Sequence, residues 1–119
     1  MESNSSVSQL LAEYIAKSRY DDLPPEVITE TKRAVLDWLG SAIAGALEPP
    51  ARMAQAVVST LGESDEATVF GSRRAAAANA AMANGISSHI LELDDVHKGS
   101  TLHPAASTIS AALKVGRGG

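Results

Sequence analysis

The stretch Ser87–Pro104, SSHILELDDVHKGSTLHP, decides how the rest of this chain is arranged. It contains all three histidines of the sequence, together with three carboxylates and one lysine. An alanine-rich segment precedes it, and Pro104 opens an apolar segment after it, so both flanks have the composition of helices. Groups that exchange protons, held between two apolar helices, are where chemistry is expected in a chain of this kind.

Outward from this loop, the spacing of apolar residues predicts five helices. They are expected over residues 7–18, 25–46, 51–61, 73–91 and 104–115. Ser5 or Ser6 is available as N-cap of the first helix, and Ser72 as N-cap of the fourth. Gly62 stands just past the third helix, as a C-terminal glycine does. Residues 67–70 have strand-like composition but no partner segment, so we expect an extended connector there.

The second predicted helix is the longest and the most apolar. Its buried stripe is expected to contain Ile28, Thr31, Val35, Trp38, Leu39 and Ala42. Its second half consists of small apolar residues almost all round, so we expect it to be covered on several sides. Gly40 and Gly45 would allow another backbone to approach closely there.

Composition limits the class of protein. A chain of 119 residues is one domain by length, and its 45% hydrophobic and 20% charged residues are typical of a globular protein. Aromatic residues make up only 3%, so the core has to consist of small and aliphatic side chains at close helix contacts. These features predict an all-α fold.

Charge and cysteine content exclude several functions. The net charge is −4 and no basic run is present, so nucleic-acid binding is not expected. The absence of cysteine excludes disulfides, thiolate metal sites and cysteine nucleophiles. No signal peptide and no membrane-spanning run can be read in the sequence. We therefore expect a cytoplasmic protein without membrane or nucleic-acid partners.

Two metal-dependent interpretations of the central loop were weighed. Imidazole and carboxylate suit many divalent ions, but no tight zinc-type spacing of histidines is present. The run Leu93–Val96, LDDV, is similar to the aspartate-rich magnesium motif of all-α prenyl diphosphate synthases. That motif needs a third aspartate where this chain has Lys98, and its paired arginines are absent. Neither metal interpretation is favoured.

Metal-free acid/base chemistry is the third interpretation. Adjacent carboxylates and histidines can supply a base and a proton donor at neutral pH. Lys98 and the start of the helix at Pro104, with Ser107 close by, would hold a substrate carboxylate. The structural alternative is a solvated helix end at Asp94 and a histidine of the helix face at His89. For His89 we expect this structural role, and for Asp94 and His103 a functional one.

Three segments carry a resemblance to a known family. They are Val35–Gly40 (VLDWLG), Ala80–Gly85 (AAMANG) running into Ser88 and His89, and Leu93–His97 (LDDVH) followed by His103 and Pro104. In this order they resemble the N-terminal part of the MmgE/PrpD family, over about residues 8–113. That family includes 2-methylcitrate dehydratase, cis-aconitate decarboxylase and iminodisuccinate epimerase.

The resemblance implies a large all-helical domain with a smaller α+β lid, a homodimer, and catalysis without metal or organic cofactor. The site residues it implies are Asp94, Asp95 and His103, with His97 as a neighbour. Many members have aspartate where this chain has Glu92, and threonine where it has Val96, which affects the identity of the substrate. Members are several hundred residues long, so we expect the N-terminal piece of such an enzyme.

We therefore expect one all-α domain over residues 1–119, with about five helices. The expected function is lyase or isomerase chemistry on a small di- or tricarboxylate, with dehydration of the 2-methylcitrate type favoured. The expected catalytic residues are His103 and Asp94, and the expected substrate-binding residues are Asp95, His97, Lys98 and Ser100. No metal or cofactor is expected. The alternative is a catalytically incomplete helical module that serves only structure or dimerisation.

Overall fold

The computed structural model describes residues 6–115, with side chains described up to residue 113. Its contacts divide the chain into two compact units, residues 1–31 and 32–119. The described residues form five α-helices, one short 3-10 helix and two strands of two residues each. The prediction of an all-α fold with about five helices is confirmed. No helix of this described part is both long and apolar enough to cross a membrane.

The first unit contains α1 (Val7–Lys17), the 3-10 helix η1 (Tyr20–Asp22) and the start of α2. Ser6 is the N-cap of α1, because its hydroxyl accepts from the Gln9 backbone while the Gln9 side chain accepts from the Ser6 backbone. No residue of α1 is buried. The apolar residues of this helix are all more than half exposed: Val7, Leu10, Leu11, Tyr14 and Ile15.

Helix α2 (Pro25–Gly45) has a narrower buried face than the sequence predicts. Trp38 and Ala42 are buried, whereas Thr31 is exposed and its hydroxyl donates to the Val27 carbonyl of its own helix. Ile43 is 55% exposed. The prediction that the second half of α2 is covered on several sides is therefore wrong for the described residues, since only one face of the helix is buried.

The two glycines of this half differ in their surroundings. Gly45 is buried against α4, and a methyl group placed on it would overlap the Ser87 carbonyl oxygen and come within 2.7 Å of Ile90 Cγ2. A methyl group on Gly40 would meet nothing within 4 Å. Close backbone approach is confirmed at Gly45 and is wrong for Gly40.

These surroundings predict opposite effects of alanine. We expect Gly45→Ala to lower the free energy of unfolding by about 2 kcal/mol or more, because backbone atoms of α4 have to move. The matched control Gly40→Ala should raise it by up to about 1 kcal/mol through better helix propensity. Urea denaturation of both variants checks this, and equal effects at the two positions would contradict the close contact.

Helix α3 (Pro49–Thr60) begins two residues before the predicted start. Pro49 and Pro50 belong to its first turn, where proline is accepted because a backbone N–H there has no helical partner. The helix ends at Thr60 with Leu61 as its C-cap, and Gly62 follows with a φ of 108°. This is the left-handed backbone that a C-terminal glycine supplies, as predicted.

The segment predicted as an unpaired connector is a strand, which corrects the sequence interpretation. Strand β1 (Ala67–Thr68) pairs antiparallel with β2 (Arg74–Ala75), Ala67 opposite Ala75. Helix α4 (Ala77–His89) therefore begins later than predicted, because β2 uses the residues assigned to its first turn. Ser72 donates its backbone N–H to Val69 in the intervening turn, and the Glu66 carboxylate accepts from Ala77 at 2.9 Å.

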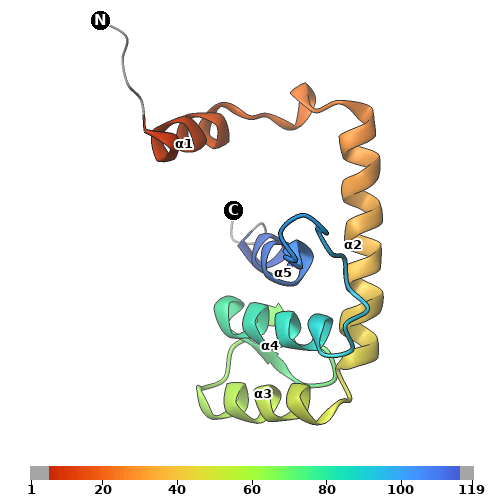
Figure 1. Cartoon of the computed structure of the whole chain (residues 1–119). Coiled ribbons are helices and arrows are strands. Elements are labelled where there is room, and N and C mark those ends of the chain that lie inside the picture. Colours follow the sequence, from red (N-terminus) through yellow and green to blue (C-terminus); the bar gives the residue numbers. More distant parts are fainter. Residues whose placement is uncertain (1–5, 116–119) are drawn as a thin grey trace, which may run out of the picture. The chain divides into compact units, whose positions relative to one another are not determined.

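Helices α3, α4 and α5 (Pro104–Val115) form the body of the second unit, with α4 in contact with both of the others (Figure 1). Gly85 of α4 faces the Ala106 carbonyl of α5 closely enough that an added methyl group would lie 3.0 Å from it. Trp38 is the largest buried side chain, and its indole N–H donates to Ser110 Oγ at 3.1 Å.

Asn84 connects α4 to the strand region. Its side chain is fully buried, its amide oxygen accepts from Phe70 N and its amide nitrogen donates to Thr68 O. Both polar ends of the buried amide are thereby satisfied. Asn84 and Gly85 both belong to the segment Ala80–Gly85. Asn84 fixes α4 to the strand region, and Gly85 lets α4 pack closely against α5.

Candidate functional site

The loop between α4 and α5 is shaped by local backbone contacts. Helix α4 ends at His89, earlier than predicted, and Glu92 follows with a φ of 51°. Glu92 has therefore left the helix and does not share a helix face with His89. Further along, His97 donates its backbone N–H to the Leu102 carbonyl at 2.8 Å, which closes a turn directly before His103.

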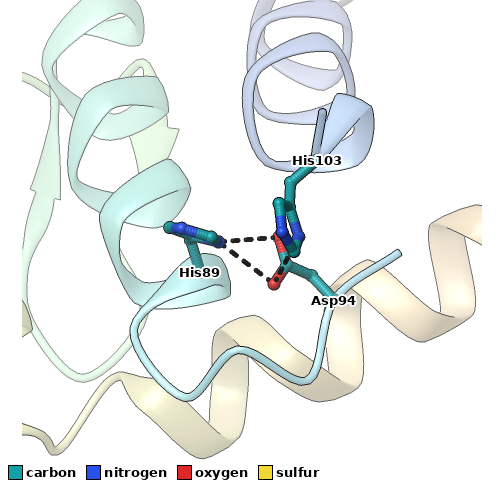
Figure 2. A group of neighbouring side chains, drawn as sticks. All are labelled: His89, Asp94 and His103. Atoms are coloured by element: carbon teal, nitrogen blue, oxygen red, sulfur yellow. Dashed lines mark hydrogen bonds and ion pairs between the residues drawn. The ribbon is translucent and has the colours of Figure 1, made fainter. Parts of the chain in front are cut away.

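Asp94 lies between two histidines that come from the two helix ends. Its carboxylate is fully buried. Both of its oxygens lie 3.1 Å from Nδ1 of His89, and Oδ1 lies 3.4 Å from Nδ1 of His103. Figure 2 shows His89 at the end of α4, His103 at the start of α5 and Asp94 on the loop between them.

The contact with His103 is looser than the contact with His89. At 3.4 Å it is in ion-pair range but is not aligned as a hydrogen bond, so the buried Nδ1 of His103 has no hydrogen-bond partner among the described residues. The two imidazole rings contact each other edge to face, with centroids 4.7 Å apart.

This arrangement limits where protons can sit. An ionised carboxylate only accepts hydrogen bonds, so a ring nitrogen that bonds to Asp94 has to carry a proton. In a neutral imidazole with Nδ1 protonated, Nε2 holds the free lone pair. Asp94 therefore favours the form of His89 in which Nε2 can take a proton, and its carboxylate beside Nδ1 of His103 favours the same form of that ring.

Both histidines line a pocket of about 690 Å³ between α4 and α5. The rest of its wall is mostly small or apolar and includes Met82, Ile86, Leu102 and Ala106. The proton-exchanging groups are thus on the wall of a concave, largely apolar space, as in many small-molecule sites.

The predicted substrate-binding residues lie on the same loop, but the structure gives them other contacts than those of the two histidines and Asp94. The Asp95 carboxylate accepts from the Ala105 backbone at 3.0 Å and so caps the start of α5. The His97 ring lies 2.8 Å from Ser100 Oγ, and both residues are exposed. Lys98 is also exposed, and no hydrogen bond or ion pair within the described residues joins it to the two catalytic candidates. Substrate contacts of these four residues stay a prediction.

His89 is the residue that the sequence interpretation placed on the structural side. In the structure it is hydrogen-bonded to Asp94, five positions later, a contact that the sequence did not predict. Its position was visible as a histidine at the end of the alanine-rich helix, but only the return of the loop brings Asp94 back to it. The candidate site is therefore the set His89, Asp94 and His103, which includes the predicted pair Asp94 and His103; the catalytic roles stay a prediction.

Comparison with known proteins identifies a family for the part of the chain that contains these helices and the loop. The family model described as the MmgE/PrpD N-terminal domain matches residues 9–117, which is most of the chain. No curated protein and no solved structure matches. The chain therefore belongs to the MmgE/PrpD family, as its N-terminal portion, and the resemblance read from the sequence is confirmed.

Proposed function

We propose that this member of the MmgE/PrpD family carries out acid/base chemistry on a small di- or tricarboxylate, with dehydration of the 2-methylcitrate type as the favoured reaction. The observation that supports it is the buried Asp94 carboxylate, held between two histidines on the wall of a pocket. A base able to act near neutral pH is what proton removal beside a carboxylate requires. The proposal includes no metal and no cofactor.

In this proposal the two imidazoles divide the work of a dehydration. His103 takes the proton from the carbon next to a substrate carboxylate, through Nε2. The bond from the neighbouring carbon to its hydroxyl breaks, and that hydroxyl leaves as water with a proton supplied by an acid. His89 is assigned the acid role as an imidazolium, which gives the proton on its Nε2 to the hydroxyl and keeps the proton on Nδ1 beside Asp94, since its ring contacts that of His103 and shares Asp94 with it. Asp94 stabilises the imidazolium that forms.

A substrate carboxylate needs cationic or N–H partners. Lys98 and Ser100 are proposed for this role, because they lie on the turn that leads into His103. Asp95 already accepts from the Ala105 N–H, so it occupies part of the α5 N-terminus that was expected to hold the substrate. We therefore assign Asp95 the shaping of the pocket rather than direct charge contact.

Deuterium exchange tests the proposed function directly. The protein is incubated in D₂O with 2-methylcitrate, with cis-aconitate and with iminodisuccinate, and the substrates are followed by proton NMR. Loss of signal from a carbon-bound proton next to a carboxylate, or formation of the unsaturated product, supports the proposal. No exchange and no product with any of these substrates would contradict it.

Chelation gives a separate prediction. We expect EDTA to leave the rate of turnover unchanged, because proton transfer by His103 and Asp94 needs no ion. We also expect no ion bridging Asp94, Asp95 and His97. The rate before and after EDTA and dialysis checks this. A loss of turnover that Mg²⁺ or Zn²⁺ restores would show metal-dependent chemistry instead.

A second candidate function is a structural or dimerisation module. It is favoured by the apolar residues of α1, which are all more than half exposed, as a helix face covered by another chain would be. A homodimer in the cytoplasm fits both candidate functions. Sedimentation analysis with the exchange assay separates them, because a module dimerises without exchanging substrate protons.

A further inference from the structure

We propose that His89, Asp94 and His103 also bind a first-row transition-metal ion, with Zn²⁺ as the best fit, and that this ion inhibits the protein. The inhibition rests on the function proposed above, because the ion would occupy the groups that transfer protons. Metal binding does not depend on that function. No part of the family comparison assigns such a site.

The separations of the ligand atoms fit a small ion. Each of the three residues offers one ligand atom, and these atoms all lie within 4.8 Å of one another. Asp94 oxygens stand 3.1 Å from Nδ1 of His89 and 3.4 Å from Nδ1 of His103. Tetrahedral zinc with bonds of about 2.0–2.1 Å keeps its ligands about 3.3 Å apart. The carboxylate oxygens are therefore already spaced from both ring nitrogens as two ligands of one zinc ion would be. The His89 side chain is 48% exposed, so it has room to turn.

The ligand types select the class of ion. Two imidazole nitrogens with one carboxylate oxygen suit Zn²⁺, Cu²⁺ or Ni²⁺, whereas Mg²⁺ and Ca²⁺ prefer oxygen ligands alone. Three protein ligands leave the fourth position of a tetrahedral ion open, as in catalytic zinc sites. Here that position would be taken by water or by the carboxylate of a substrate bound in the adjoining pocket.

Burial supports the site independently of the distances. The Asp94 side chain is fully buried, and the buried Nδ1 of His103 has no hydrogen-bond partner among the described residues. Buried polar atoms are normally satisfied, and an ion coordinated by this nitrogen would satisfy it. Exposed acidic clusters lack this feature.

Coordination at Nδ1 explains the inhibition. The metal takes the lone pair of Nδ1, so the proton on that nitrogen has to move to Nε2. A ring with metal on Nδ1 and a proton on Nε2 has no lone pair left, and it cannot take a proton from a substrate. Asp94 is at the same time withdrawn from orienting either ring.

Titration of the metal-free protein with Co²⁺ and Zn²⁺ tests the proposal. We expect one ion per chain, intense visible Co²⁺ bands of tetrahedral type, and displacement of Co²⁺ by Zn²⁺. His89→Gln and His103→Gln should each weaken binding by about 100-fold or more, since loss of even a supporting contact costs 10- to 100-fold. His97→Gln is the matched control, because that exposed ring pairs with Ser100 and should leave the metal affinity unchanged. Circular dichroism confirms that each variant is folded.

Substoichiometric binding to the wild type would overturn the proposal, and so would binding lost in His97→Gln but retained in His89→Gln. A wild type that turns over substrate without loss of rate at saturating Zn²⁺ would overturn the inhibition and leave the proposed function standing. Stoichiometric binding that needs both histidines, with no turnover of any carboxylate, would support the metal site and contradict the proposed function. EDTA should restore the rate of the inhibited protein.

Discussion

Asp94→Asn is expected to lower turnover by about 10²- to 10⁴-fold, the range observed when an acid/base residue or the carboxylate that orients it is lost. The carboxylate is hydrogen-bonded to Nδ1 of His89 and lies 3.4 Å from Nδ1 of His103, so it favours a proton on both of these nitrogens. An amide has a single acceptor oxygen and presents an N–H group on its other side. The asparagine oxygen would therefore accept from one ring, while its N–H group would face Nδ1 of the other. That second ring would have to carry its proton on Nε2, so its Nε2 could no longer act as a base.

The same substitution also removes a buried charge, so its effect on folding has to be measured with its effect on rate. Asp37→Asn is the control, because Asp37 is exposed on α2 and the substitution removes the same charge away from the site. We expect the control to leave turnover unchanged. Steady-state rates with thermal denaturation of both variants check this. Similar rates for wild type and Asp94→Asn would show that Asp94 does not orient the histidines.

The helices could be predicted because their signals are local. Ser6, Pro25 and Gly62 mark helix ends through contacts within a few residues, and the structure places all three as predicted. The pairing of Ala67 with Ala75 could not be predicted in this way. Two strands of two residues each have no periodicity, and their partners are recognised only when the turn between them forms.

The site was predicted in part for the same reason. Asp94 and His103 belong to one loop, and the density of polar groups in that part of the sequence predicts a functional role for both. His89 belongs to a helix whose sequence is otherwise apolar, and its partner is reached only after the chain reverses at Glu92, which has a φ of 51°. A positive φ at a residue other than glycine carries little sequence signal, so the contact of His89 with Asp94 could come only from the structure.

The two neighbouring aspartates of the loop have different surroundings in the structure. Asp94 and Asp95 are adjacent and chemically identical in the sequence, yet one is buried between imidazoles and the other caps α5. The sequence assigned Asp94 to catalysis and Asp95 to substrate binding, and both roles stay predictions, but it could not show that Asp95 caps α5.

His103 is the second residue with a large expected effect. Pro104 fixes the start of α5 and keeps His103 outside the helix, on the wall of the pocket. Glutamine keeps a polar side chain of similar reach that can donate to Asp94, but it has no nitrogen that takes up a proton at neutral pH. The substitution therefore removes proton transfer and preserves most of the packing.

The rate of turnover of His103→Gln, measured together with its melting temperature, tests most directly whether His103 exchanges the substrate proton. We expect turnover to fall by about 10²-fold or more, the usual cost of losing an acid/base group, with the melting temperature within a few degrees of wild type. Unchanged turnover, or a large loss of stability with a proportional loss of activity, would show that His103 is a structural residue at the start of α5.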